Sequence, residues 1–538
     1  MSIELARAPS LNQIEAASKD EEKAVIEQTE HAAEKLHEVV VDKDAAGYTD
    51  PTVEIDDVDN KRLRRMINFR VLPCMCACYL AQALDKGAIS TASIMGLQKD
   101  TVSFTRFRED ERLTLPQGMV GQDYAWATTA FNIGVIVGQF PSNRAIQILP
   151  LGKLMSGALI LWGIILLIMG LMDNYKPILA LRLLLGLGES VVGPVLLATS
   201  VMWYRRAEQI FVVNTYISSY GFGSIISGLL GWGFYQVQPG QVRLKAWQML
   251  FVIIAALSIV LGVVVGLFLP DSPPRAKCFS ERDKVLMVER VRSNDQGIKN
   301  PKWNWAQFRE GVTDIYVWCF VTIALLNTLV VGGLGTFQGL LINQAFGFSV
   351  SDAQLLQMPL GNFQVLLYMS SAWLAHRYMQ SIYTLLAMCI PNIVGTIVLL
   401  TVTPSQSTRG GLLVAFYIMQ SYQAQTPLYY QLCSRNVAGH TKRVFAYAAV
   451  FTANGVGNAI SSQLFQAQWA PRYMPTLYIH LGLYAAMIVM LLSTRLLLVT
   501  RNKTRDARRD SGEVVETSHL HAFEDLTDRQ NPDFRYML

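Results

Sequence analysis

Apolar runs long enough to cross a bilayer recur along the chain between residues 68 and 499. A helix needs about 20 mostly apolar residues to span the hydrocarbon layer. On this basis we expect twelve spans, in two groups of six. The first group covers 68–92, 124–148, 154–172, 177–203, 210–235 and 247–269, and the second covers 314–338, 352–374, 381–402, 410–433, 444–466 and 475–499. The pattern predicts an all-α membrane protein built from two six-helix halves.

Polar segments flank and divide these groups. We expect a disordered tail over 1–60, a first bundle over 61–270, a central loop over 271–313, a second bundle over 314–500 and a disordered polar tail over 501–538. In the central loop, Ser280 and Asp283 have the spacing of a capping box, which predicts a short amphipathic helix. We expect three aromatic residues of the same loop to lie along the membrane interface, namely Trp303, Trp305 and Phe308.

Composition agrees with a membrane protein and excludes other classes. The chain is 51% hydrophobic and only 16% charged, whereas soluble proteins carry nearer a quarter charged residues. Its formal net charge of +5 is small for 538 residues, and no basic run with interleaved aromatics predicts nucleic-acid binding. Phosphate loops, zinc-binding spacings and nucleophile elbows are missing from the sequence, so we expect no enzyme activity and no cofactor. The cysteines of "CMCACYL" are expected to be small buried hydrophobes, with a metal or redox role as the alternative.

Lysines and arginines gather in loops that fall on one side if there are twelve spans. They occur in "KRLRRMINFR", "YRRAEQ", "AHRYMQ", "GHTKR" and "RNKTRDARR", whereas the loops of the opposite side are mostly short and poor in them. The loop at 98–123, with "RFREDER", is the exception. The positive-inside rule therefore places both termini in the cytoplasm. We expect a multi-pass protein with an uncleaved first span, acting as a monomer in the bilayer of the plasma membrane.

Four charges lie in the interior of predicted spans one and four. Arg182 and Glu189 stand seven residues apart in span four and share one helix face, and Asp85 and Lys86 are adjacent in span one. Such residues are costly in a bilayer and usually face the bundle interior. Two interpretations remain open for this cluster. It could be an ion-pair network that only joins the two spans, or a carboxylate that exchanges protons beside a cation that holds an anionic substrate.

The layout of two six-helix halves is that of a transporter of the major facilitator type, which binds its substrate near the midplane between the halves. "RLLLGLGE" fits the R-x-x-x-G-x-x-E pattern of the anion:cation symporter branch of that superfamily. "LDKGAISTASIMGLQKD", "LPLGKLMS", "FLPDSPPRAK", "LLNTLVVGGLGTFQGLLINQAFGFS", "NVAGHTKR" and "ANGVGNAISSQLFQAQWAPRY" are similar to motifs of the fungal allantoate permease family. The resemblance covers about residues 60 to 500 in matching order.

The resemblance implies roles for the four charges. Asp85 and Glu189 would handle protons, Lys86 would face the substrate carboxylate, and Arg182 would be the partner charge on span four. The chain also departs from the family where the binding cavity is expected. Gly87 and Ala88 replace a usual asparagine or threonine, Ser461-Ser462-Gln463 replaces Gly-Pro-Gln, and Gln423 stands where the family has asparagine.

Polar and aromatic residues at similar depth are expected to form the rest of the cavity wall. These candidates are Tyr220, Phe337, Gln338, Tyr422, Gln423, Asn454 and Asn458. The alternative for each is an interhelical contact.

The resemblance favours proton-coupled uptake of a small organic anion such as a carboxylate, a vitamin or a ureide. Two alternatives stay open on the same fold: export of a specialised metabolite, which the altered cavity motifs suggest, and a non-transporting nutrient receptor. The expected partners are therefore a small organic anion and protons, with no metal and no nucleic acid.

Overall fold

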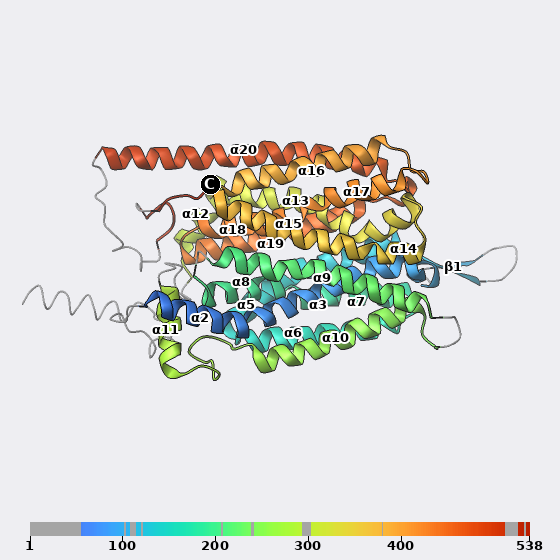
Figure 1. The fold of residues 1–538 in the computed structure, drawn as a ribbon, viewed down its shortest axis with the longest axis horizontal. Coiled ribbons are helices and arrows are strands. Elements are labelled where there is room, and N and C mark those ends of the chain that lie inside the picture. The colour runs from blue at the N-terminus through green and yellow to red at the C-terminus, as the bar shows by residue number, and fades with distance from the viewer. Residues whose placement is uncertain are drawn as a thin grey trace, which may run out of the picture.

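The computed structural model describes residues 55–101, 104–107, 114–119, 122–205, 208–237, 242–292, 303–378, 380–511, 526–531 and 534–538. Two groups of roughly parallel helices lie side by side (Figure 1). The helices of the first group, coloured blue to green, form one long side of the molecule, and those of the second, coloured yellow to red, form the other. The division agrees with the two halves predicted from the apolar pattern.

Helices occupy every span predicted in the first half. They are α2 (Asp57–Arg70), α3 (Leu72–Ala92), α5 (Asp123–Ile148), α6 (Leu151–Gly170), α7 (Tyr175–Glu189), α8 (Val192–Trp203), α9 (Gln209–Tyr235) and α10 (Ala246–Phe268), with a π-helical turn η1 (Ser93–Leu97) and the short α4 (Gln98–Asp100) after α3. Because α2 begins at Asp57, the prediction of a disordered tail up to residue 60 is wrong for its last residues. Residues 1–54 of that prediction lie outside the described residues.

The second half is likewise helical at each predicted span. Its elements are α12 (Trp305–Thr313), α13 (Ile315–Leu340), η2 (Leu341–Ala345), α14 (Val350–Leu355), α15 (Gln357–Tyr378), α16 (Ser381–Thr401), α17 (Arg409–Met419), η3 (Gln420–Tyr422), α18 (Gln425–Asn436), α19 (His440–Leu464), η4 (Ala467–Trp469) and α20 (Met474–Asp510). The tenth predicted span is thus two helices, α17 and α18, separated by the 3₁₀ turn η3.

Seven helical segments of the described chain are long and apolar enough to cross a membrane. They are Asp57–Asp100, Leu151–Gly170, Tyr175–Trp203, Ala246–Phe268, Ile315–Ala345, Ser381–Thr401 and Met474–Asp510. The other five predicted spans correspond to α5, α9, α15, α17–α18 and α19. Four of these pack across the boundary between the halves, α5 on α19 and α9 on α15, and a helix facing protein can carry more polar residues than one facing lipid. The number twelve therefore stays a prediction.

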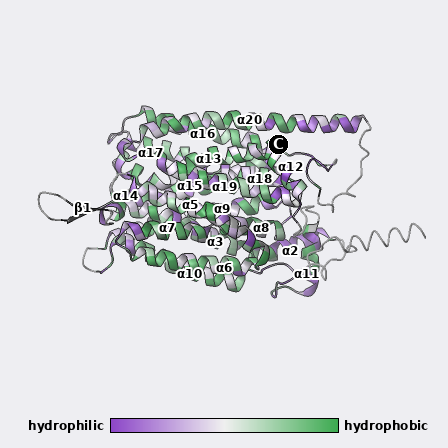
Figure 2. Cartoon of the chain, turned by 180° about the vertical axis from the view of Figure 1, so that it is seen from behind, coloured by the Kyte–Doolittle hydropathy of each residue, from purple (hydrophilic) through white to green (hydrophobic). Residues whose placement is uncertain are grey.

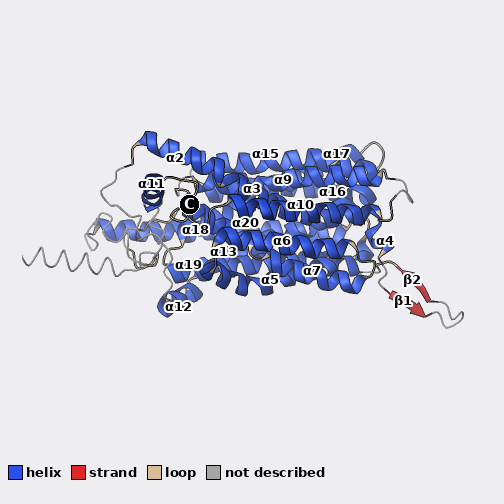
Figure 3. Cartoon of the chain, turned by 90° about the horizontal axis from the view of Figure 1, so that it is seen from below, coloured by secondary structure: helices blue, strands red, loops and turns tan. Residues whose placement is uncertain are grey.

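A short antiparallel hairpin lies in the predicted outer loop 98–123. Strand β1 (Phe104–Phe107) pairs with β2 (Thr114–Gln117), with Phe104 opposite Gln117. The hairpin lies in a loop between α4 and α5, where the backbone can pair with itself, and the two bundles are all-α as predicted. Figure 3 shows both strands extending beyond the helices, at the end away from α11.

The opposite end collects the elements of the predicted cytoplasmic side. Figure 1 shows α2, α11 (Glu281–Arg292), α12 and the C-terminus together at that end. The predicted amphipathic helix is confirmed as α11, whose Asp283 amide donates to Ser280 Oγ at 3.2 Å. Trp303 and Trp305 are 48% and 72% exposed, and their indole rings contact each other beside α12. Their place at a membrane interface stays a prediction.

The C-terminal tail is more ordered than its polar composition suggests. Helix α20 continues to Asp510, and Figure 2 shows its hydrophobic part along the bundle and its hydrophilic part beyond it. Residues 526–531 and 534–538 pack against the helix ends, with Tyr536 only 3% exposed. The prediction of disorder is wrong for these residues, because buried hydrogen bonds replace an apolar core there. Residues 512–525 lie outside the described residues.

Hydrogen bonds join the two halves near the hairpin end. Tyr124 Oη donates to the Thr336 carbonyl at 3.1 Å, and the Gly339 amide donates to Ser90 Oγ at 3.1 Å. These contacts place α3 and α5 of the first half against α13 of the second, and α3 carries two of the four charges inside the predicted spans.

Candidate functional site

The four charges inside the first half meet as two ion pairs between α3 and α7. Lys86 Nζ lies 2.8 Å from Glu189 Oε1, and Arg182 Nη1 lies 3.9 Å from Asp85 Oδ1. The first pair is at hydrogen-bonding distance and the second is looser. The structure thus brings together all four residues singled out from the sequence.

Helix geometry separates the surroundings of the two pairs. Asp85 and Lys86 are neighbours on α3, so their side chains leave the helix in directions about 100° apart. The Asp85 side chain is fully buried, whereas that of Lys86 is 40% exposed. One pair is therefore enclosed in the first bundle, and the cation of the other faces open space.

The Asp85–Arg182 pair is poorly satisfied. Neither carboxylate oxygen of Asp85 has a hydrogen-bond partner among the described residues, and the same is true of Arg182 Nε and Nη2. Arg182 lines a small cavity within the first half together with Trp247 and Phe251, and its guanidinium lies 5.8 Å from the centre of the Phe251 ring. Buried charges without hydrogen bonds are costly, which makes this pair a candidate for a change of state during function.

Gly186, between Arg182 and Glu189, allows α5 to approach α7. A Cβ atom at this position would lie 2.0 Å from the carbonyl oxygen of Phe131, so a side chain cannot be accommodated without moving α5. The missing side chain thus lets the helix that carries both charges pack directly against its neighbour.

Gln82 completes the environment of Glu189 and was missed from the sequence. Its Nε2 donates to Glu189 Oε1 at 2.6 Å, so this oxygen is shared between the Gln82 amide and the Lys86 ammonium. Gln82 precedes Lys86 by four residues and so lies on the same face of α3. That spacing was the signal that could have found it.

Two tyrosines lie near the Lys86 ammonium and connect it to the second half. Tyr79 and Tyr220 both lie within electrostatic range of Lys86. Tyr79 is also within range of Tyr429, on α18 of the opposite half, and the Tyr220 hydroxyl lies close to Gly335 of α13. Lys86 therefore faces the boundary between the halves. Tyr220 was predicted for this wall, but Tyr79 and Tyr429 were not.

Two of the predicted second-half residues are engaged in packing. Phe337 stacks on Phe465 with ring centres 4.7 Å apart and contacts Tyr124 edge-on at 5.3 Å. Gln338 Nε2 donates to Gln357 Oε1 at 2.9 Å, and both side chains are buried. In this conformation the two residues make the interhelical contacts that we gave as the alternative, and their role in substrate binding stays a prediction.

Tyr422 and Gln423 lie in a buried network at the break in span ten. Tyr422 Oη donates to Gln420 Oε1 at 2.8 Å, and Gln423 Nε2 donates to the same oxygen at 2.8 Å. Gln423 Oε1 accepts from Tyr368 at 3.1 Å. These bonds fix the turn that joins α17 to α18.

Asn454 and Asn458 are half-buried and connect to the tyrosines of α18. Asn454 Nδ2 donates to Tyr430 Oη at 2.8 Å, and Asn458 Nδ2 donates to Asn454 Oδ1 at 2.8 Å. Tyr430 in turn stacks on Phe451 of α19, with ring centres 4.9 Å apart. Asn454 therefore contacts the tyrosines of α18 directly, and Asn458 is connected to them through Asn454.

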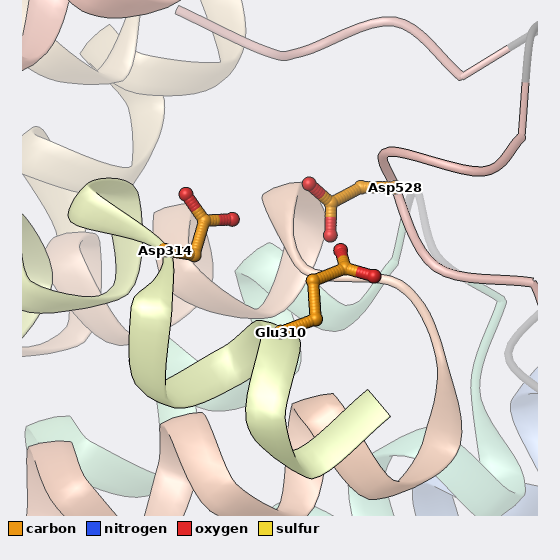
Figure 4. A group of neighbouring side chains, drawn as sticks. All are labelled: Glu310, Asp314 and Asp528. Carbon is orange, nitrogen blue, oxygen red and sulfur yellow. The ribbon is translucent and has the colours of Figure 1, made fainter. Parts of the chain in front are cut away.

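A second charge cluster lies at the predicted cytoplasmic end. Three carboxylates from α12, from the residue before α13 and from the C-terminal segment converge in Figure 4, namely Glu310, Asp314 and Asp528. Their spacing would suit a cation, but the Lys442 ammonium occupies the centre, at 2.9, 2.7 and 2.6 Å from them respectively. The cluster is an ion-pair network with its own internal cation.

The electrostatics of this cluster are set by its cations. Burial alone would raise the pKa of the Asp314 carboxyl, but hydrogen bonds from Arg501 and Lys442 hold that pKa well below its usual range. Asp314 Oδ1 accepts from Arg501 at 2.7 Å, and its Oδ2 lies 2.7 Å from Lys442 Nζ. The carboxylate therefore remains ionised and holds three elements together.

Comparisons with known proteins agree with the geometry. The family model described as Major Facilitator Superfamily matches residues 75–462. An uncharacterized transporter, C417.10 of Schizosaccharomyces pombe, is 32% identical, covering 90% of this chain and 91% of its own. The allantoate permease of Saccharomyces cerevisiae is 27% identical over 90% of this chain and 88% of its own length. The high affinity cysteine transporter of the same yeast is 26% identical over 90% of this chain and 92% of its own length.

Among solved structures, the proton:xylose symporter XylE superposes with a TM-score of 0.59 at 13% identity, over 81% of this chain and 96% of that one. At this identity the likeness concerns the fold alone. The chain therefore belongs to the Major Facilitator Superfamily, within its fungal allantoate permease-like family, and is a membrane transporter rather than an enzyme.

Proposed function

We propose that this transporter takes up a small organic anion together with protons, by alternating access of the site between its halves, at the plasma membrane. The observation that carries the proposal is the Lys86–Glu189 pair. Its cation is 40% exposed at the boundary between the halves, and its carboxylate lies 2.8 Å away. An anionic group entering from this boundary meets a cation that is already paired.

The pairing supplies a way to couple the anion to a proton. A substrate carboxylate and Glu189 compete for the same ammonium group. When Glu189 takes up a proton it loses its charge, its attraction for Lys86 falls, and Lys86 can bind the substrate instead. Binding of a proton and binding of an anion therefore favour each other, which is the linkage that symport requires.

The enclosed pair provides a second acid. The Asp85 side chain is fully buried, and its nearest cation is Arg182 at 3.9 Å. We propose that Asp85 also binds a proton during the cycle and that Arg182 stabilises its ionised form. In this conformation Arg182 lines the internal cavity of the first half, so it supports Asp85 rather than meeting the substrate from that position.

The relatives support the class of substrate. Allantoate and cysteine, which appear in the names of two of them, both carry a carboxylate group. A carboxylate is the group that an exposed lysine near two tyrosines would bind. Tyr220 and Asn454 lie on the two sides of the boundary and would contact the remainder of the molecule.

Uptake by purified protein in lipid vesicles tests the proposal. With an inward proton gradient, radiolabelled allantoate, cysteine and a panel of small carboxylates are offered to the wild type, to Glu189→Gln and to a matched control, Asp173→Asn, at an exposed acid outside the site. We expect accumulation by the wild type and the control. We expect Glu189→Gln to lose accumulation and to keep exchange, because a neutral side chain mimics the protonated acid.

Each alternative has its own outcome. Accumulation by Glu189→Gln equal to that of the wild type would show that Glu189 does not couple protons. Substrate movement only outward, against proton entry, would replace the importer with an exporter. Binding without flux would indicate a receptor.

A further inference from the structure

The described C-terminal residues 526–531 and 534–538 form a segment that we name the C-terminal strap. It lies against the predicted cytoplasmic ends of second-half helices, near α12 and α18 (Figure 1). Its central anchor is Asp528, which is fully buried. Asp528 Oδ1 lies 2.6 Å from Lys442 Nζ, and its Oδ2 accepts from Tyr536 Oη at 2.7 Å. One strap residue thus binds the lysine at the start of α19 and fixes a second strap residue.

Two asparagines hold the backbone of the strap in the manner of a paired strand. Asn436, at the end of α18, donates to the Met537 carbonyl at 2.9 Å and accepts from the Met537 amide at 2.6 Å. Asn502, on α20, donates to the Tyr536 carbonyl at 2.9 Å and accepts from the Tyr536 amide at 3.1 Å. Each asparagine uses both of its polar atoms on one strap residue, which requires a defined position of the strap.

Further bonds extend the strap to other second-half helices. The Ser381 amide, at the start of α16, donates to the Leu538 carbonyl at 2.8 Å. Arg529 Nη2 lies 3.0 Å from Asp314 Oδ1, before α13, and Thr527 Oγ1 donates to Glu310 of α12 at 2.9 Å. All these partners belong to the second half. The strap therefore ties six helices of one half to each other.

Among the helices that the strap contacts, α18 is the one whose position depends most on the strap. The turn η3 interrupts span ten, so α18 is joined to α17 without a continuous helical hydrogen-bond ladder. Helix α18 carries Tyr429 and Tyr430, which contact Asn454 on α19. A shift of α18 would therefore move part of the wall that faces Lys86.

We propose that the C-terminal strap couples α18 to the other helices of the second half, so that α18 moves together with them during transport. When the strap is released, α18 pivots at η3, Tyr429 and Tyr430 lose their positions, and transport slows. When the strap is held in place, transport continues, because all of the strap's partners move as one body.

The native cysteines provide a readout that needs no substrate. Cys433 lies on α18 and is 1% exposed, whereas Cys78 lies on α3 of the first half and is fully buried. Labelling of both by a maleimide, read by mass spectrometry of the full-length protein, measures the opening of α18 against an internal reference.

Release is produced by Asp528→Asn and, more mildly, by Tyr536→Phe. Trypsin cleavage at Arg529 and Arg535, which are exposed, reports whether the strap has left, with cleavage at the exposed Arg508 as the reference. We expect strap cleavage and Cys433 labelling to rise at least tenfold in Asp528→Asn, Cys78 labelling to stay constant, and exchange of radiolabelled allantoate to fall severalfold. Tyr536→Phe should lie between that variant and the wild type.

Retention is produced by a crosslink between the strap and α20. Arg535 and Asp506 form an exposed ion pair at 3.2 Å, so Arg535→Cys with Asp506→Cys can be joined by a short bifunctional thiol reagent, with the exposed Cys278 changed to serine. The chain with only one of the two cysteines is the control. We expect the crosslinked protein to exchange allantoate at the rate of the control.

Three results would overturn the proposal. The first is a strap that stays protected in both Asp528→Asn and Tyr536→Phe, which would show that these anchors do not hold it. The second is a released strap with Cys433 labelling unchanged. The third is a crosslinked strap that blocks exchange, because the strap would then have to leave during each cycle.

Discussion

The two halves of this transporter carry different kinds of polar side chain in the middle of their helices. Among the described residues of the first half, α3 and α7 carry Asp85, Lys86, Arg182 and Glu189 in two ion pairs. In the second half, α13 and α15 to α19 carry Asp, Glu, Lys and Arg only near their ends, and their middles hold amides and tyrosines. The first half therefore contains the groups that can change charge with a proton or an anion. These second-half helices contain groups that can shape a binding site without changing charge.

The halves resemble each other more closely at the predicted cytoplasmic end. In the first half, Arg290 of α11 is buried and pairs with Glu208, and it donates to Asn60 of α2 at 2.7 Å. In the second, Lys442 has the corresponding central position between Asp314 and Asp528. Each half thus has a buried cation that joins helix ends. The contrast at mid-depth consequently reflects the binding site and not a general difference in polarity.

We expect the largest effect when one residue of the enclosed Asp85–Arg182 pair is left without its partner. Arg182→Met removes the cation that is paired with Asp85, and breaking a buried pair costs about 3–5 kcal/mol. We expect a large fall in the unfolding temperature of the detergent-solubilised protein. The double variant with Asp85→Asn should recover most of it. Equal unfolding temperatures for the single and double variants would show that the 3.9 Å pair does not couple the two residues.

The next effect concerns the exposed cation. Lys86→Gln removes the group proposed to bind the substrate carboxylate, and losing one partner of such a charge pair costs about 2 kcal/mol or more, or at least ~30-fold in affinity. The measurement is the apparent KM for whichever carboxylate of the panel is taken up. Lys86→Arg keeps the charge and serves as the control. An unchanged KM in Lys86→Gln would move the anion site away from α3.

A pH series sharpens the likeness between the two clusters at the predicted cytoplasmic end. Because the folded pKa of Asp314 is lowered, its stabilising effect is present above the unfolded value of about 3.9 and is lost as the pH falls towards the folded value. Asp314→Asn should cost about 2 kcal/mol at pH 7, and the difference from the wild type should shrink below about pH 4. Thermal unfolding at stepped pH measures this. A constant difference across the series would contradict it.

Asp283 of α11 is the matched acid in the first half. Burial would raise the pKa of its carboxyl, but hydrogen bonds from Ser280 and Arg62 lower it. Its partner Arg62 is 46% exposed, so solvent screens the pair. Asp283→Asn should therefore show the same direction of pH dependence with a smaller amplitude.

The smallest effect is expected in the second half. Asn454→Ala removes the 2.8 Å hydrogen bond to Tyr430, a longer one of 3.3 Å to Tyr429 and the bond accepted from Asn458 within α19, and hydrogen bonds between membrane helices contribute about 0.6 kcal/mol on average. The KM should change about threefold, without loss of proton coupling. A change as large as that of Lys86→Gln would erase the contrast between the halves.

The charged core of the site could be predicted from the sequence because a charge in an apolar run needs a partner within the protein. Arg182 and Glu189 required two opposite charges, and span one offered Asp85 and Lys86. Their pairing could not be predicted, since it depends on the rotation of α3 against α7. Gln82 was missed because an amide in a span has many possible roles, although its spacing from Lys86 was informative.

The C-terminal strap could not be predicted because the contacts that stabilise it leave no periodic pattern in the sequence. It packs through single residues such as Asp528 and Tyr536, whose partners lie far away in the sequence. The packing contacts of Phe337 and Gln338 could not be predicted for the same reason, because the depth of a residue in a span does not determine which side chains it touches. Spans, by contrast, were predicted because apolar length is a property of each segment alone.

The balance of charge in the first half has an electrical consequence. Two cations and two carboxylates sum to zero, so the unloaded site carries no net charge through the membrane field. A substrate with one negative charge, carried with the Glu189 proton alone, leaves the loaded site neutral as well, whereas carrying a second proton on Asp85 would add one positive charge. Each uncompensated charge would couple to the membrane voltage by about 2.3 kcal/mol per 100 mV. Uptake of a monoanion with one proton will then be driven by the pH difference alone, and clamping the voltage of the vesicles will leave its rate unchanged.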